Sequence, residues 1–204
     1  MEHQLRRTLA TTLGALALAG CNGAAPGPDQ QAVRHYGELA FTPCTLTAPY
    51  LTTNVEAQCT TYEVAEDPAR PEGRKVALNI AWLPATNEGA ATDDPVFFLA
   101  GGPGQSAVQV WPAIDGAFRE VRKSRHIVLV DQRGTGKSNP LACKDTEGRN
   151  AYSDPDDLSE AAAAAFARDC AASLKADPRF YTTTDAVRDL DSVRKALGAA
   201  KINL

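Results

Sequence analysis

Two short apolar runs in this chain each lead directly into a glycine-rich loop, and this repeated pattern constrains the fold most. The first run spans residues 95–100 and meets Gly101-Gly-Pro-Gly104, and the second spans residues 126–130 and meets Asp131-Gln-Arg-Gly-Thr-Gly-Lys-Ser138. Short apolar, β-rich runs that end at glycine are typical of strands buried on both faces of a sheet. Glycine lets backbone N–H groups come close to a ligand. The pattern therefore predicts parallel central strands with a ligand site at their carboxyl ends.

The rest of the chain predicts the elements around these two strands. Residues 60–65 and 75–83 indicate an antiparallel pair of strands, because a turn-rich segment separates two β-forming runs. Apolar residues at helical spacing predict an irregular helix over 106–121, a helix over 158–174, and a third that begins after the threonines at 182–184 and ends at Gly198. Residues 202–204 look like the start of another strand. This order predicts an α/β fold with a mostly parallel sheet, antiparallel N-terminal strands, and an incomplete C-terminal end.

The first residues are typical of a bacterial export signal. Arg6 and Arg7 precede an apolar stretch over residues 8–19, which ends in Leu-Ala-Gly-Cys21 and resembles a lipobox. We expect a lipoprotein-type signal peptide over 1–20, a lipid-bearing Cys21, and a flexible Pro/Gly-rich tether over 21–37. The alternative is an uncleaved N-terminal helix. The apolar stretch is too short to cross a bilayer, which takes about 20 residues.

Length and charge constrain the part of the chain after the signal. Without residues 1–20 the chain keeps 19 of its 21 basic and 24 of its 25 acidic residues, a net charge of −5. This balance indicates no nucleic-acid partner. The remaining length fits one globular domain over 38–204. We expect a protein of the bacterial cell envelope, held at a membrane by its lipid.

Cysteine use fits an exported protein. Apart from Cys21, the chain has four cysteines, for which three disulfide pairings are possible. We expect the sequence-local pairing, Cys44 with Cys59 and Cys143 with Cys170. The chain has no Cys-x-x-Cys motif, and no histidine lies near these cysteines. The sequence therefore predicts no metal and no cofactor.

Together, the two glycine loops and the stretch from Asp177 to Leu204 resemble the α/β-hydrolase fold. The likeness is to the branch with proline iminopeptidases and secreted tripeptidyl-aminopeptidase-like hydrolases, and it covers most of residues 40–204. In that branch the first loop supplies a backbone donor of the oxyanion hole, so the resemblance implies Gly102 as donor, with Gly101 next. Pro103 and Gly104 then shape the loop, although a purely structural glycine turn remains the alternative. Family members often carry histidine where this chain has Ala100.

The resemblance implies a scaffolding role for the second loop. Asp131, Arg133 and Gly134 are expected to hold the loop near the site, since charged side chains can make strong hydrogen bonds there. The ending Gly-Thr-Gly-Lys-Ser138 also resembles a nucleotide P-loop. That motif requires glycine at the position of Asp131, whose carboxylate would repel phosphate, so we expect no bound nucleotide.

A complete hydrolase of this type needs a serine nucleophile within Gly-x-Ser-x-Gly, an acid and a histidine. Ser106 and Ser138 stand in incomplete versions of the motif, and Ser192 lies in a helical pattern. The histidines fit no better, because His3 and His35 precede the domain core and His126 begins a strand. We therefore expect the catalytic triad beyond Leu204 and an inactive isolated chain.

The expected function is the N-terminal part of an exported serine hydrolase. The resemblance implies an aminopeptidase that forms an acyl-serine and acts on a peptide or a small ester or amide. The alternatives are an esterase of the same fold and a lipoprotein domain that binds without catalysis.

Overall fold

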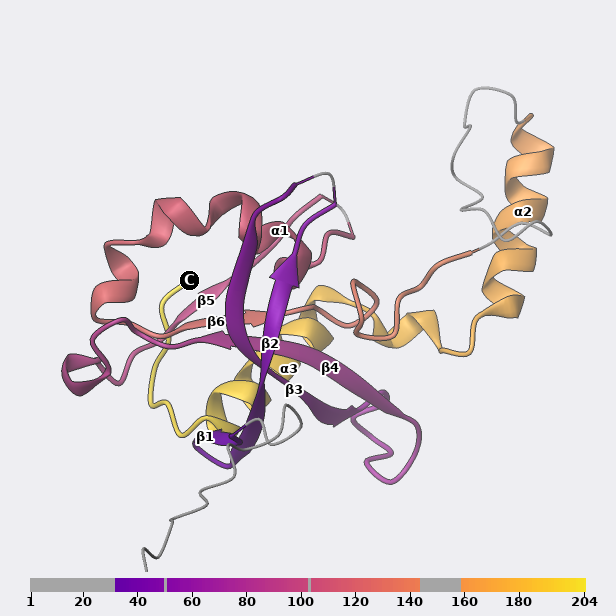
Figure 1. Ribbon diagram of the computed structural model, residues 1–204. Coiled ribbons are helices and arrows are strands. Elements are labelled where there is room, and N and C mark those ends of the chain that lie inside the picture. The colour runs from indigo at the N-terminus through magenta and orange to yellow at the C-terminus, as the bar shows by residue number, and fades with distance from the viewer. Residues whose placement is uncertain (1–31, 50, 103, 144–158) are drawn as a thin grey trace, which may run out of the picture. The chain divides into compact units, whose positions relative to one another are not determined.

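The computed structural model describes residues 32–49, 51–102, 104–143 and 159–204. Its centre is a six-stranded sheet with the order β1-β2-β3-β4-β6-β5. The strands are β1 (Arg34–Tyr36), β2 (Leu39–Thr47), β3 (Asn54–Ala65), β4 (Lys75–Leu83), β5 (Val96–Phe98) and β6 (Ile127–Val130). Figure 1 shows β2, β3 and β4 as the long strands and β5 and β6 beside them.

Most strands of this sheet run antiparallel, which corrects the prediction of a mostly parallel sheet. Strands β1 to β4 form an antiparallel series, and β4 also pairs antiparallel with β6. Only β5 and β6 are parallel neighbours. The reason is that connections of at most nine residues join β1 to β4 in series, whereas a crossover that contains α1 connects β5 to β6. The α/β class and the antiparallel pair over 60–65 and 75–83 are confirmed.

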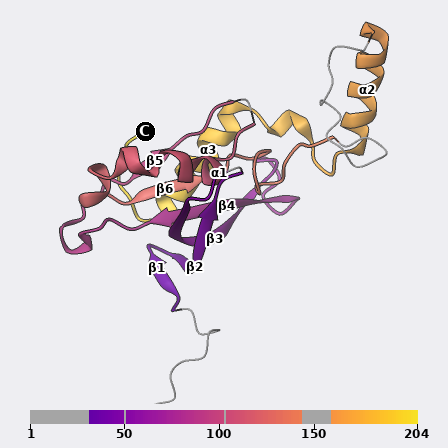
Figure 2. The same cartoon turned by 45° about the horizontal axis from the view of Figure 1, so that its top comes forward.

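Helices cover both faces of the sheet. On one face α3 (Thr183–Ala196) packs through Val193, Ala196 and Leu197, and on the other α1 (Ala107–Ile114) packs through Ala107 and Trp111. Side chains along β4 point alternately to the two faces of the sheet, so this strand contributes to the apolar contacts on both. Leu78 and Ile80 lie on the face covered by α3. Figure 2 shows the same elements from a second direction. Burial on both faces explains why β6 is apolar throughout.

Helix α3 lies close to its predicted bounds, whereas α1 is much shorter than the helix predicted over 106–121. Thr182 caps α3, because its hydroxyl accepts a hydrogen bond from the backbone N–H of Asp185, and Gly198 follows the helix with φ of 71°. Pro112 lies inside α1, which gives way to two 3₁₀ turns, Asp115–Phe118 and Val121–Lys123. Helix α2 spans Glu160–Ser173. Among the described residues, none of the helices has the length and apolar character needed to cross a membrane.

Residues near the two ends of the described domain meet. The backbone N–H of Glu38 donates to the carbonyl of Ala196 at 2.8 Å, and a side chain at Gly37 would collide with that carbonyl. Farther along, Asn203 pairs in parallel with Val96 as an isolated bridge, in line with the strand start predicted there. The N-terminal hairpin is therefore fixed against the last helix.

The predicted tether over 21–37 extends too far. Arg34–Tyr36 form β1 and pair with β2, because these residues have partners at Phe41, Ala40 and Leu39. The rest of that range up to residue 31 lies outside the described residues, as do the signal peptide over 1–20, Cys21 and Pro103.

Both expected disulfides are present. Cys44 and Cys59 join β2 to β3 with their Cα atoms 5.8 Å apart. Cys143 and Cys170 join the segment after β6 to α2, with a Cα separation of 5.4 Å. The first bridge closes a hairpin and the second holds a helix to a loop.

Candidate functional site

The first glycine loop follows β5 and adopts backbone conformations that need glycine. Gly102 has φ of 130° and Gly104 has φ of 82°. A Cβ atom at Gly102 would lie 2.8 Å from Cγ of Gln105, whereas one at Gly101 would meet nothing within 4 Å. The carbonyl of Gly101 accepts a hydrogen bond from the N–H of Gln105 at 3.1 Å, which closes the loop.

The N–H groups of Gly101 and Gly102 have no hydrogen-bond partner among the described residues. Both glycines are exposed. Fixed backbone donors of this kind stabilise negative charge that develops on an oxygen, since they need not reorganise. The loop can therefore act as an oxyanion site in its present conformation.

Ser106 connects the first loop to the second. It is the N-cap of α1, because its Oγ accepts from the N–H of Gln109 at 3.0 Å. The same hydroxyl donates to Oδ1 of Asp131 at 2.6 Å, and the side chain is buried. Ser106 is thus committed to two structural hydrogen bonds.

Asp131 is the centre of this arrangement and lies directly after β6. Its carboxylate accepts four hydrogen bonds and is 1% exposed. The donors are Ser106 Oγ and Val108 N at Oδ1, and Asn79 Nδ2 and Lys137 N at Oδ2, over distances of 2.6 to 3.1 Å. One side chain therefore ties β4, β6, the start of α1 and the second loop together.

The second loop wraps around this carboxylate. Gly136 has φ of 51°, and a Cβ atom there would overlap Oδ2 of Asp131. Gly134 has φ of 84° and packs against the ring of Tyr181. Ser138 is fully buried, and its Oγ accepts from the N–H of Asn79 at 2.8 Å. The space where a P-loop would hold phosphate is filled by the loop's own aspartate.

Arg133 points away from the first loop toward α3. It forms a two-bond ion pair with Asp189, both distances being 2.6 Å, and donates to three backbone carbonyls. These carbonyls belong to Ala65, Glu66 and Phe180. All five N–H donors of the guanidinium are therefore used.

The pKa values of both members of this buried pair are raised, and for Asp189 burial raises the pKa more than the contact with Arg133 lowers it. Burial lowers the pKa of Arg133, but the hydrogen bonds and the negative charge of Asp189 outweigh burial and hold that pKa above its ordinary value. The pair joins the second loop to the end of β3 and to α3. Asp131 and Arg133 thus fasten opposite sides of one loop.

The serines and histidines considered as nucleophiles or bases have other contacts. Ser192 donates to the carbonyl of Arg188 on the exposed side of α3. His126 accepts the N–H of Ala85 at Nδ1, 3.0 Å away, and burial lowers its pKa. His35 is exposed on β1. Within the described part of the chain, no group of three or more His, Cys, Asp or Glu side chains could hold a metal ion.

Sequence reasoning missed the partners that hold the two loops. Asn79 lies in a strand pattern without any special signal. Ser106 has one, because a serine just before a helix is a common N-cap. Asp189 also has one, since it stands on the apolar face of α3 between Ala186 and Val193, where a carboxylate needs a buried partner.

Two of the pockets formed by described residues lie along the sheet, and the first glycine loop lines neither of these two. One of about 320 Å³ lies between the end of β3 and α3, next to Arg133 and Asp189. The other, of about 390 Å³, lies beside β3 and the segment after β4.

Comparison with known proteins links the chain to hydrolases. The serine protease Hip1 of Mycobacterium tuberculosis is 27% identical over 212 residues, which cover 92% of this chain and 38% of that protein. A tripeptidyl aminopeptidase of Streptomyces lividans is 28% identical over 158 residues, 72% of this chain and 29% of that protein. A carboxylesterase B of M. tuberculosis is 37% identical over 101 residues, 47% of this chain and 18% of that protein.

These relatives are distant and longer than the chain. The chain spans less than two fifths of the length of each of the three, and no protein-family model matches it. The matches support a hydrolase and are consistent with an α/β-hydrolase-type family.

Proposed function

We propose that this chain is the N-terminal part of a serine hydrolase and supplies one side of its oxyanion hole. The observation that carries the proposal is the first glycine loop, where Gly101 and Gly102 are exposed beyond the carboxyl end of β5. Its position next to β6 matches where sheets of this class place their ligands. The matches to the serine protease and the tripeptidyl aminopeptidase cover 92% and 72% of the chain, which is long enough to include this segment. The names of the relatives give both peptide and ester hydrolysis.

In the proposed mechanism a serine outside this chain attacks the substrate carbonyl. Its proton passes to a histidine, and an acyl-serine forms as the amine or alcohol leaves. The N–H of Gly102, with Gly101 as the second choice, donates to the carbonyl oxygen as it becomes negative. Water then releases the acid. Asp131 acts as a positioning residue, because it holds α1 and therefore the end of the loop.

The proposed substrate is a peptide cleaved near its amino terminus. The tripeptidyl aminopeptidase supports this choice, since its alignment covers 72% of the chain. Ester hydrolysis is the second candidate, because the carboxylesterase is more similar over a shorter stretch, at 37% identity. Gly101 and Gly102 would serve peptide and ester hydrolysis alike, since attack on an amide or an ester carbonyl forms the oxyanion in the same way.

Labelling with a fluorophosphonate tests the proposal. The 204-residue chain should remain unlabelled, and the product of the gene read beyond Leu204 should be labelled at one serine. A tripeptidyl p-nitroanilide and a p-nitrophenyl ester then separate peptidase from esterase. A labelled serine within the 204 residues, or an unlabelled longer product, would contradict the proposal and leave the non-catalytic binding domain as the explanation.

The loop itself is tested by two neighbouring glycines in that longer product. Gly102→Ala should lower kcat roughly 100-fold, because alanine disfavours φ of 130° and its Cβ would displace Gln105. Gly101→Ala is the matched control, since a Cβ there meets open space. Its kcat should stay within about threefold of the parent, with KM little changed in both variants. Equal effects at the two positions would argue against an oxyanion role for Gly102.

A further inference from the structure

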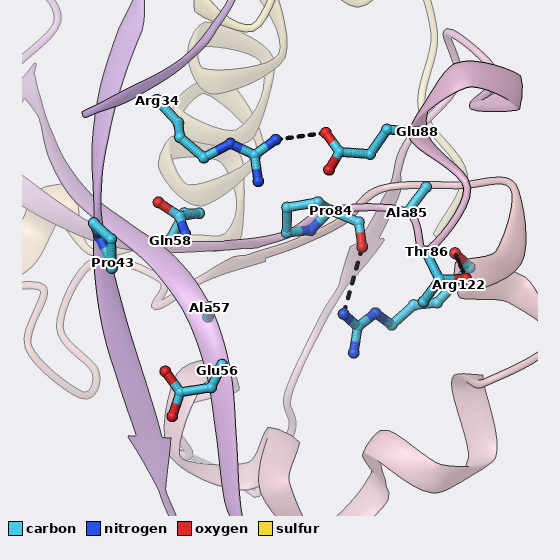
Figure 3. A pocket seen from close by; sticks show the side chains of 10 residues that line it. All are labelled: Arg34, Pro43, Glu56, Ala57, Gln58, Pro84, Ala85, Thr86, Glu88 and Arg122. Atoms are coloured by element: carbon cyan, nitrogen blue, oxygen red, sulfur yellow. Dashed lines mark hydrogen bonds and ion pairs between the residues drawn. The ribbon is translucent and has the colours of Figure 1, made fainter. Parts of the chain in front are cut away.

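The pocket of about 390 Å³ lies at the opposite end of β6 from the glycine loops. It is bounded by β1, by the middle of β3, and by the segment that follows β4, as Figure 3 shows. Leu83, the last residue of β4, pairs with Ile127 at the start of β6. The glycine loops begin after Val130, three residues further along and about 10 Å away. The pocket is therefore separate from the proposed oxyanion site.

Two opposite charges line this pocket without pairing to each other. Glu56 projects from β3, and Arg122 comes from the 3₁₀ turn after α1 (Figure 3). Among the described residues, no ion pair joins the two. The carboxylate of Glu56 accepts only the hydroxyl of Thr45, at 3.0 Å. Arg122 is paired instead with Asp115, at 3.2 Å.

The guanidinium of Arg122 makes only long hydrogen bonds among the described residues. Its two hydrogen bonds are long, 3.2 Å to Asp115 and 3.4 Å to the carbonyl of Pro84. Its Nε is buried and has no hydrogen-bond partner among the described residues. Guanidinium groups bind carboxylates through two parallel hydrogen bonds, so this side chain has capacity for one more acceptor.

Gln58 gives a second unsatisfied polar atom at the same pocket. Its Oε1 is buried and has no hydrogen-bond partner among the described residues. A buried polar atom without a partner destabilises a fold, and such atoms are rare. Small rotations of Gln58 and Arg122 toward the pocket would let a bound molecule satisfy both.

The other walls favour a small ligand. Arg34 and Glu88 form an ion pair across one side, and Arg34 also stacks 4.7 Å from the ring centre of Trp82. This pair satisfies its own charges. The remaining walls are small and mostly apolar: Pro43, Ala57, Pro84 and Ala85. They leave room for a short main chain with small side chains.

We propose that this pocket binds a short zwitterion, either a free amino acid or a short peptide with free ends. Its carboxylate binds the guanidinium of Arg122, and its ammonium group binds the carboxylate of Glu56. The amide of Gln58 hydrogen-bonds the part of the ligand between these charges. The inference does not rest on the proposed hydrolase function, because it uses other residues at the other end of the strand.

Calorimetric titration of the 204-residue chain at pH 7 tests the pocket. Trialanine and alanine are the two probes, and saturable heat with either one supports the site and identifies which kind of zwitterion it takes. Acetylating the amino terminus or amidating the carboxyl terminus should each weaken binding at least tenfold. The absence of saturable binding by both probes would overturn the proposal.

Variants locate the binding. Glu56→Gln should weaken binding of the better probe at least tenfold, and acetylation should then cost little more, because both changes remove the same contact. Glu63→Gln is the matched control, since Glu63 is also exposed on β3 but lies outside the pocket. Equal affinity in the parent and in Glu56→Gln would overturn the assignment.

Arg122→Gln should weaken binding similarly and remove the effect of carboxyl amidation. Arg119→Gln serves as its control, because Arg119 is exposed and not part of the pocket. Circular dichroism checks that each variant is folded. If Arg122→Gln does not fold, titration of Glu56→Gln still tests the proposal, because Glu56 is exposed and its replacement leaves the core unchanged.

Discussion

At the scale of single residues, Asp131 requires a carboxylate. All four of its partners donate hydrogen bonds, and two of these donors are backbone N–H groups, of Val108 and Lys137. Each oxygen of Asp131 accepts one of them. An asparagine at this position would place an NH₂ group against one backbone N–H whichever way its amide points.

Asp131→Asn should therefore destabilise the chain by about 3 kcal/mol, since it leaves buried donors unpaired. Urea unfolding followed by circular dichroism measures the change. Asp191→Asn is the control, because the side chain of Asp191 is 45% exposed and its ion pairs are on the surface. A loss for Asp131→Asn no larger than that of the control would show that the network contributes little to stability.

His126 makes stability depend on pH in a defined window. Its Nδ1 accepts the N–H of Ala85, so this nitrogen must be unprotonated in the folded chain. Burial lowers the pKa of His126, Glu88 opposes that effect and Arg34 adds to it. A group with a lowered pKa in the folded state binds fewer protons than in the unfolded chain. Its contribution is therefore complete above about pH 6.5 and is lost as the pH falls below that value.

His126→Asn should remove part of the pH dependence of Tm between about pH 5 and 6.5, because asparagine keeps an acceptor but does not titrate. Thermal unfolding at half-unit pH steps checks this. His35→Asn, on the exposed side of β1, should leave the curve unchanged. Parallel curves for the parent and His126→Asn would contradict the assignment.

At the scale of elements, Gly136 in the second loop and Gly198 at the end of α3 differ in the space around them. Gly136 and Gly198 both have positive φ, at 51° and 71°, but a Cβ at Gly136 overlaps Asp131 whereas one at Gly198 meets nothing within 4 Å. Both alanine variants incur backbone strain of about 1 kcal/mol. Only Gly136→Ala also displaces the buried carboxylate.

We expect Gly136→Ala to lower the free energy of unfolding by at least about 2 kcal/mol more than Gly198→Ala, because steric overlap in a closely packed region adds to the strain. Urea unfolding of the two variants side by side gives the difference. Similar losses at the two positions would mean that the loop can move away from Asp131 at little cost.

Local patterns predicted the elements better than their connections. Apolar runs ending in glycine located β5 and β6, and the threonine cap located α3, because these signals lie within a few residues. The sheet order and the short β1 were missed, since pairing depends on partners elsewhere in the chain. The Arg133–Asp189 pair spans 56 residues, and only the misplaced carboxylate on the apolar face of α3 could have indicated it. In the candidate site, the glycines and the scaffolding side chains of Asp131 and Arg133 were predicted, whereas the partners of these two side chains were not.

At the scale of the whole molecule, the proposed lipid anchor depends on one residue outside the described part of the chain. Cys21 follows Leu-Ala-Gly after an apolar stretch. Cys21→Ser should move the protein from the membrane fraction to the soluble fraction of cells, because no acyl chain can be attached. Mass spectrometry of the parent should show a lipid-modified N-terminal cysteine. Cys44→Ser is the control, and it should stay with the membrane although it loses a disulfide. Membrane association of Cys21→Ser would instead favour an uncleaved N-terminal helix.

The contact between Glu38 and Ala196 has a consequence for how the chain acquires its structure during synthesis. These residues are 158 positions apart, so the first hairpin cannot reach its partner until the chain through Ala196 has left the ribosome. Contacts of such long range slow folding, since a large loop must close before any stabilisation is gained. The domain therefore completes its fold late, and a nascent chain remains open to chaperones or an export channel until α3 has been made.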